Sequence, residues 1–131
     1  MECKANYLGN MKVKVEMNNR ETIIDAERID GNAPMDTIIS ALTACTTISI
    51  VTILKRMHEN FIGISTKVKW DQEQEPPRIF KKIDLEYIVK GEVSESGMKK
   101  ALELTFKKYS PSAVILQRAG LEINASFKIE Q

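Results

Sequence analysis

The feature that most constrains this chain is a stretch of eighteen residues without charge, Thr37 to Leu54, in which Ser and Thr alternate with Ile, Leu, Val and Ala. An uncharged run of this length must be covered either by other protein or by lipid. Seven of the eighteen residues are Ser or Thr, and the rest of the chain shows amphipathic periodicities. Both observations favour protein over lipid, so we expect a soluble protein with no membrane partner.

Composition narrows the class further. With 131 residues, 43% apolar and 28% charged, the chain fits one globular domain spanning residues 1–131. Its formal net charge is +1 and it has no basic block, so we expect no nucleic-acid partner. The N-terminus lacks the apolar core of a signal peptide, and the chain has only two cysteines. We therefore expect a cytoplasmic protein whose thiols stay reduced.

Alternation of apolar and polar residues predicts strands on both sides of the uncharged stretch. Two of them, Met11–Met17 and Thr22–Ile24, flank the turn residues Asn18, Asn19 and Arg20 and are expected to form a hairpin. Later strands are predicted around residues 66–71, 83–89 and 121–130. Because the strands cluster apart from the helices, this order favours an α+β fold with mainly antiparallel sheet over a doubly wound parallel fold.

The uncharged stretch itself is predicted to be a helix that begins near Asp36 and ends around His58. Eleven of its eighteen residues are Ile, Val or Thr, which disfavour helix, but strands rarely run to this length without a turn residue. A stripe at helical spacing supports the helix and consists of Ile38, Leu42, Cys45 and Ile48. Tertiary burial must hold such a helix, and a second helix, for example the same one from a twin subunit, is its natural neighbour.

A second helix is predicted after the strand that stops at Gly91, with Ser94 or Ser96 as its cap. Pro111 should end this helix, and residues 112–117 are expected to add a further turn or short helix. The apolar side of this second helix, before Pro111, is predicted to carry Met98, Ala101, Leu102, Phe106 and Tyr109.

Three segments occur in a characteristic order: APMDTIISALTAC, the strand that follows PPRIF, and the helix end KKYSPS. Together they resemble the OsmC and organic-hydroperoxide-resistance superfamily over most of the chain. The resemblance implies antiparallel sheets packed around a long buried central helix in an intertwined homodimer. Such a dimer would hide an uncharged helix in a protein this small.

The resemblance also implies a chemistry. Family members typically act as thiol peroxidases, in which the cysteine of the central helix attacks an organic hydroperoxide, becomes a sulfenic acid and is resolved by a second cysteine. Cys45 holds the position of the nucleophile, whereas Ser110 stands where the resolving cysteine is expected. A hydroxyl cannot form the disulfide. Either an external thiol reduces the sulfenate directly, or the catalytic cycle has been lost.

Activation of Cys45 requires a polar partner, because a thiol among apolar atoms should have a raised pKa unless a cation or hydrogen-bond donor reaches it. The family's activating arginine has no counterpart in GNMKVKV. Met35 stands where the best-studied peroxidases carry a glutamate, while Asp36 matches the acidic residue of a less studied branch. Arg20 and Arg28 are the remaining candidates for an activating cation.

Structural interpretations compete with these roles. A free cysteine in a helix is usually a small core residue, and Asp36 fits a helix N-terminal charge better than a catalytic acid. Cys3 is expected to be a strand residue or a frayed terminus, with replacement of the resolving thiol as its other possible role. His58 lacks a second His or a Cys pair for a metal site, and no motif indicates a cofactor.

Two functions therefore remain open. The first is a one-cysteine thiol peroxidase that uses Cys45 against a fatty or other organic hydroperoxide in an apolar slot at the dimer interface and is regenerated by an external thiol. The second is a non-catalytic dimer that binds an apolar ligand in the same cavity. A redox sensor that accumulates mixed disulfides at Cys45 is a third, weaker alternative.

Overall fold

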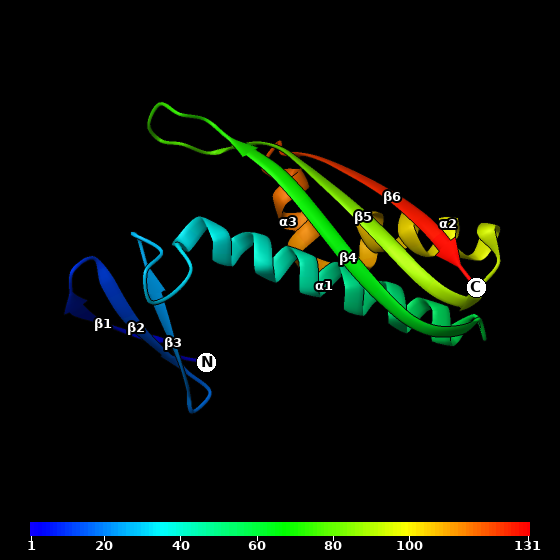
Figure 1. Ribbon diagram of the computed structural model, residues 1–131, viewed down its shortest axis with the longest axis horizontal. Coiled ribbons are helices and arrows are strands. Elements are labelled where there is room, and N and C mark those ends of the chain that lie inside the picture. The colour runs from blue at the N-terminus through cyan, green and yellow to red at the C-terminus, as the bar shows by residue number, and fades with distance from the viewer. The chain divides into compact units, whose positions relative to one another are not determined.

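The computed structural model describes residues 1–131 and contains six strands and four helical segments (Figure 1). Two compact units are formed by residues 1–41 and 42–131, and the division falls inside the long helix α1. Our expectation of one domain over the whole chain stays a prediction. In chain order the elements are β1 (Lys4–Gly9), β2 (Lys12–Met17), β3 (Arg20–Asp25), α1 (Pro34–Arg56), β4 (Asn60–Gln72), β5 (Phe80–Glu92), α2 (Glu95–Leu104), η1 (Thr105–Tyr109), α3 (Pro111–Arg118) and β6 (Glu122–Glu130).

The first unit contains an antiparallel sheet in the order β1-β2-β3. The predicted hairpin is confirmed, but its turn is shorter than predicted, since Arg20 begins β3 and pairs with Met17. Asn18 and Asn19 between them have φ of 53° and 59°. Two successive positive φ angles match the right-handed twist of the strands, and asparagine tolerates them well. Strand β1 was not predicted, because its sequence KANYLG lacks the apolar alternation that identifies a half-buried strand.

Helix α1 begins two residues before Asp36 and ends two residues before His58, so the predicted helix is confirmed. At its end the N–H of Glu59 donates to the carbonyl of Leu54 and the N–H of His58 donates to that of Lys55. With φ of 59° at His58, these bonds form the common left-handed helix ending. By length and composition alone α1 could cross a membrane.

The inward line of α1 differs from the predicted stripe. Leu42 is fully buried as expected, but Ile38 is 40% and Ile48 is 66% exposed. The buried line instead follows Leu42, Thr46, Ile50, Ile53 and Leu54. The stripe counted apolar side chains only, so it missed Thr46, which is buried within the single chain with its hydroxyl bonded to the carbonyl of Leu42 at 2.9 Å. That a second helix covers Ile38 and Ile48 stays a prediction.

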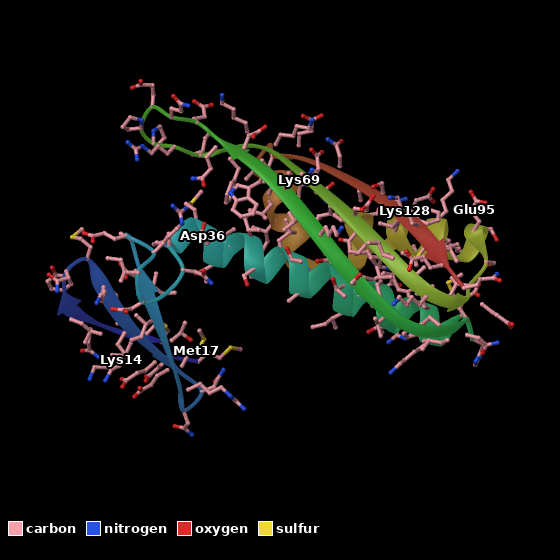
Figure 2. All side chains as sticks on the ribbon, viewed as in Figure 1. Lys14, Met17, Asp36, Lys69, Glu95 and Lys128 are labelled. Atoms are coloured by element: carbon pink, nitrogen blue, oxygen red, sulfur yellow. The ribbon has the colours of Figure 1, made fainter.

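The second sheet has the order β4-β5-β6. The β4–β5 pair is antiparallel, whereas β5 and β6 are parallel. The helical segments between β5 and β6 return the chain to the N-terminal end of β5, which a parallel pair requires. The fold is thus α+β with mainly antiparallel sheet, as predicted, with one parallel pair. Strand β5 directs alternate residues into the core, and charged residues such as Lys69 and Lys128 project into solvent (Figure 2). The inward residues of β5 are Ile83, Leu85, Tyr87 and Val89.

The second predicted helix consists of two parts. Helix α2 is capped by Ser94, whose side chain accepts the N–H of Gly97 at 3.0 Å, and then continues as the π-helical turn η1. Thr105 is fully buried where Phe106 was predicted, and Tyr109 is 43% exposed. The π-turn explains this difference, since its wider repeat rotates later side chains away from the α-helical stripe.

Candidate functional site

The side chain of Cys45 meets the start of α3 within the second unit. The Ser110 hydroxyl donates a hydrogen bond to the Cys45 Sγ, with 3.1 Å between the two atoms. Ser110 is the N-cap of α3, and its Oγ accepts the N–H of Ala113 at 3.4 Å. The sequence Ser-Pro-Ser explains this local structure, because serine caps a helix well and proline suits the first helical position. A fully buried hydroxyl therefore links the thiol to the α3 backbone.

Ser112 completes the set of donors around the sulfur. Burial raises the pKa of the Cys45 thiol, but hydrogen bonds from the Ser110 hydroxyl and from the hydroxyl and N–H of Ser112 outweigh this effect and lower the pKa below its ordinary value. The N-terminal end of a helix also favours a negative charge. The donors that we expected a reactive thiol to need are thus present, and they are neutral serines rather than an arginine.

A buried pair of hydroxyls lies on the inward side of Cys45. Tyr87 of β5 is fully buried, and its hydroxyl donates to the Oγ1 of Thr46 at 2.6 Å. Burial is the main cause that raises the pKa of Tyr87 to about 12; the bond to Thr46 lowers it, and the charge of the Cys45 thiolate raises it. Tyr87 therefore stays neutral beside the thiolate, and its hydroxyl holds Thr46, the residue next to Cys45, on the buried side of α1.

Comparison with known proteins identifies the family. The model of the family described as OsmC-like protein matches residues 25–126, which include both Cys45 and Ser110. The chain belongs to the OsmC-like family. Among curated proteins, Protein YhfA of Escherichia coli (strain K12) is 28% identical over 108 residues, which cover 77% of this chain and 80% of YhfA.

Solved structures share the OsmC-like fold at low sequence identity. An OsmC-like protein from Mycoplasma pneumoniae has a TM-score of 0.88 at 17% identity, covering 99% of this chain and 96% of its own. An organic hydroperoxide resistance protein OsmC from Legionella pneumophila has a TM-score of 0.74 at 14% identity, covering 97% and 95%. These likenesses confirm the predicted α+β fold, and the match of the family model confirms the predicted superfamily.

Asp36 of this OsmC-like chain is engaged at the start of α1 in the first unit (Figure 2). Its carboxylate accepts the N–H of Ala33 at 2.9 Å and two bonds from the Arg28 guanidinium, at 2.6 and 2.9 Å. The Arg28 bond is the main cause that lowers the pKa of Asp36. Arg28 and Asp36 thus stabilise the N-terminus of α1. A catalytic role of Asp36 stays a prediction.

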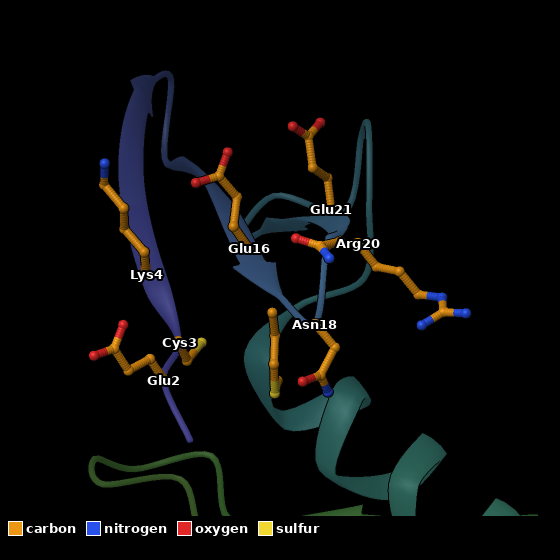
Figure 3. Close-up of a pocket in the computed structure, with 9 residues that line it drawn as sticks. Glu2, Cys3, Lys4, Glu16, Asn18, Arg20 and Glu21 are labelled. Carbon is orange, nitrogen blue, oxygen red and sulfur yellow. The ribbon is translucent and has the colours of Figure 1, made fainter.

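Cys3 lies in a different environment, also in the first unit. It lines a hollow of about 510 Å³ at the hairpin end of the sheet, together with Arg20 (Figure 3). The Cys3 side chain is exposed. The other lining residues are Glu2, Lys4, Glu16, Met17, Asn18, Asn19 and Glu21. Neither here nor elsewhere in the chain is a group of three or more His, Cys, Asp or Glu side chains placed to hold a metal ion.

Sequence reasoning found Cys45 and Ser110 but missed Ser112, Thr46 and Tyr87 as parts of the site. Ser112 could have been found from the Ser-Pro-Ser start of a short helix, since the first residues of a helix offer free N–H groups. No local signal marks Thr46 or Tyr87, because their pairing joins residues 41 positions apart.

We expect replacement of Ser110 by Ala to raise the pKa of Cys45, because it removes a donor that stabilises the thiolate. The rate of iodoacetamide alkylation, followed against pH, should reach its midpoint at lower pH in the wild type than in the variant, because the Ser110 hydroxyl lowers the pKa of Cys45. At neutral pH the variant should react several-fold more slowly.

The Ser94→Ala variant is the matched control for that measurement. It also removes an N-cap serine, at a cost of about 1 kcal/mol, but from a helix whose cap makes no bond to Cys45. An unchanged alkylation midpoint in Ser110→Ala, or an equal change in Ser94→Ala, would contradict a specific effect of Ser110 on the thiol.

Proposed function

We propose that this OsmC-like protein is a thiol-dependent reductase of organic hydroperoxides that works with one cysteine, Cys45. The observation that carries this proposal is the hydrogen bond from Ser110 to the Cys45 sulfur, 3.1 Å long, at the start of α3. An inert core cysteine would not need donors, whereas a nucleophilic thiol needs its thiolate form stabilised. Ser110, which stands where the resolving cysteine is expected, thus supports the first half of the cycle, in which the Cys45 thiolate attacks the hydroperoxide.

The proposed cycle balances with an external thiol as reductant. The Cys45 thiolate attacks the outer oxygen of the hydroperoxide; an S–O bond forms, the O–O bond breaks, and the leaving alkoxide takes a proton to become an alcohol. A first external thiol then attacks the Cys45 sulfenic acid, which gives a mixed disulfide and water. A second thiol releases Cys45 and leaves as a disulfide. One hydroperoxide and two thiols thus give one alcohol, one water and one disulfide.

The names of structural neighbours support a role against peroxides. Proteins from Legionella pneumophila and Bacillus subtilis with this fold are described as organic hydroperoxide resistance proteins. A reducing cytoplasm would supply the external thiol and keep both cysteines free. We therefore place the activity in oxidative-stress defence in the cytoplasm.

We further propose that the protein acts as a homodimer. Within the second unit, α1 exposes an uncharged face that includes Ala44, Ile48 and Thr52. Only 39% of the most apolar window of this helix is buried in the single chain. A charge-free helix face is unfavourable in water, and its small side chains let another helix approach closely. A second copy of α1 matches these requirements because both faces are then uncharged.

The activity is tested by turnover. Purified protein given cumene hydroperoxide with dithiothreitol or dihydrolipoamide should consume the peroxide. The Cys45→Ala variant should lose all of this turnover, since no other thiol meets the donors of α3, and Cys3→Ala should retain it. Peroxide consumption is followed by a colorimetric assay of the remaining hydroperoxide.

A different result would favour the binding-protein alternative. If Cys45 does not react with hydroperoxide, and if an apolar ligand stabilises the wild type and Cys45→Ala equally against heat, the scaffold binds without catalysis. Equal turnover in the wild type and Cys45→Ala would exclude Cys45 as the nucleophile.

A further inference from the structure

The first free N–H of α3 contacts the Cys45 sulfur. Residue 111 is a proline, which has no N–H, and the N–H of Ala113 donates to the Ser110 Oγ at 3.4 Å. The N–H of Ser112 has no carbonyl acceptor, as is usual for the first residues of a helix, and it donates to the Cys45 Sγ instead. A backbone nitrogen that takes no part in the helical hydrogen bonds therefore lies against the candidate nucleophile.

The surroundings of this sulfur offer no second thiol. Ser110 donates to the Cys45 Sγ at 3.1 Å, but its hydroxyl cannot form a disulfide. Cys3, the other cysteine, is exposed in the first unit. A sulfenic acid that meets no thiol is oxidised further to a sulfinic acid, which is irreversible, unless it condenses with a backbone nitrogen to a sulfenamide, which is reversible. The nitrogen of Ser112 is the contacting atom that can form such a bond.

We propose that the backbone nitrogen of Ser112 condenses with the sulfenic acid of Cys45 when external thiol is scarce, which gives a reversible sulfenamide link. An S–N bond forms, the S–O bond breaks, and the leaving hydroxide takes the amide proton as water. The sulfur keeps its oxidation level, so no further oxidant is needed. A thiol then attacks the sulfur, the S–N bond breaks, the nitrogen takes the thiol proton, and a mixed disulfide results.

The role of this link in turnover rests on the proposed function, since the hydroperoxide then supplies the sulfenic acid and the mixed disulfide is the one in the proposed cycle. An amide nitrogen is a weaker nucleophile than a thiol, so added thiol reacts with the sulfenic acid first. The link protects Cys45 from irreversible oxidation during the time when peroxide is present and thiol has run out.

The packing of α3 permits the link. Of its eight residues only Ala113 is buried, so a small shift of the first turn toward α1 displaces little core packing. Formation of the S–N bond breaks no helical hydrogen bond, because the N–H of Ser112 makes none. The Ser110 hydroxyl already donates to the sulfur and is placed to donate to the oxygen that leaves.

The link is tested in the Cys3→Ala variant, in which Cys45 is the only thiol. The protein is treated with hydrogen peroxide in the absence of thiol, because this small oxidant needs no binding slot. Intact-mass measurement should show a single chain that has lost two hydrogens relative to the reduced protein, since it gains one oxygen and loses one water. A disulfide within the chain cannot account for this mass. Dithiothreitol should restore the reduced mass, and fragmentation of the digest should join Cys45 to Ser112.

Two substitutions of Ser112, made in the Cys3→Ala background, separate its nitrogen from its hydroxyl. Ser112→Pro removes the N–H, and proline is tolerated in the first turn of a helix; this variant should form no link and should proceed to the sulfinic acid, which dithiothreitol does not reverse. Ser112→Ala keeps the N–H and should keep the link. Circular dichroism checks the fold of both variants. If Ser112→Pro does not fold, the position of the link in Cys3→Ala decides alone.

The outcomes distinguish this proposal from the proposed function. Oxidation of Cys45 to the sulfinic acid without loss of two hydrogens, or a link to a nitrogen other than that of Ser112, overturns the sulfenamide; turnover of cumene hydroperoxide by the same protein then leaves the peroxidase. A reversible link between Cys45 and Ser112 in a protein without turnover supports the sulfenamide and refutes the peroxidase. A Cys45 that reacts with neither oxidant overturns both proposals.

Discussion

Replacing Ser110 by Cys should convert the proposed peroxidase cycle from one that uses a single cysteine to one that uses two. The Ser110 Oγ already lies 3.1 Å from the Cys45 Sγ, and a cysteine has nearly the same shape with a longer bond to its terminal atom. Oxidation of Cys45 to sulfenic acid would place it next to the new thiol, which attacks the oxidised sulfur and expels water. We expect a disulfide between residues 45 and 110 after one equivalent of hydroperoxide.

The expected effect on the rate of the resolving step is large, because an intermolecular reaction with added thiol becomes intramolecular. In the wild type the decay of the sulfenic acid should be proportional to the concentration of added thiol. In Ser110→Cys it should be independent of that concentration, since a thiol held beside its target has an effective concentration far above any reductant in solution. Rapid-mixing measurements of sulfenic acid, trapped with dimedone, follow both rates.

Mass spectrometry of digested protein checks the product. The Ser110→Cys variant should lose two hydrogens and carry a peptide that joins residues 45 and 110, with Cys3 still free. Ser126→Cys, which adds a third thiol at an exposed position of β6, should form no such link. Persistent dimedone labelling of Cys45 in Ser110→Cys would show that the two side chains do not meet in solution.

Replacing Ile48 by Glu should break the proposed homodimer. Ile48 is 66% exposed in the single chain, and a surface substitution normally changes stability by no more than about 0.5 kcal/mol. If a second α1 covers it, the variant instead buries an unpaired carboxylate, which costs several kcal/mol. We expect the dissociation constant of the dimer to rise by roughly 100-fold or more, as measured by sedimentation velocity over a dilution series.

Ile115 gives a matched control, because it is 65% exposed and lies on α3 rather than on α1. Ile115→Glu should leave the dissociation constant of the dimer unchanged. Circular dichroism should show that both variants keep their helices. A monomeric wild type, or the same dissociation constant in both variants, would rule out the uncharged face of α1 as the interface.

The sequence identified most elements because their signals are local. The Asn18–Asn19 hairpin, the limits of α1, the Ser94 cap and the break at Pro111 all follow from residues within one or two turns of the element. Strand β1 was not predicted, because its sequence has no apolar face. Phe106 was placed inward by an α-helical repeat that the π-turn of η1 interrupts, and a turn of this kind has no sequence signature of its own.

The sequence by itself determined that this chain has a long uncharged helix with a central cysteine and a serine where its family expects a second one. Only the tertiary structure decided which side of that helix faces inward, because a helix without charge has no polar face to set its rotation. Burial of Leu42, Ile50 and Leu54 sets it, together with the bond of Tyr87 to Thr46, and the rotation brings Cys45 to Ser110, 65 residues away. The lowered pKa of Cys45 depends on that approach, so the chemistry of the thiol follows from packing rather than from its neighbours in sequence.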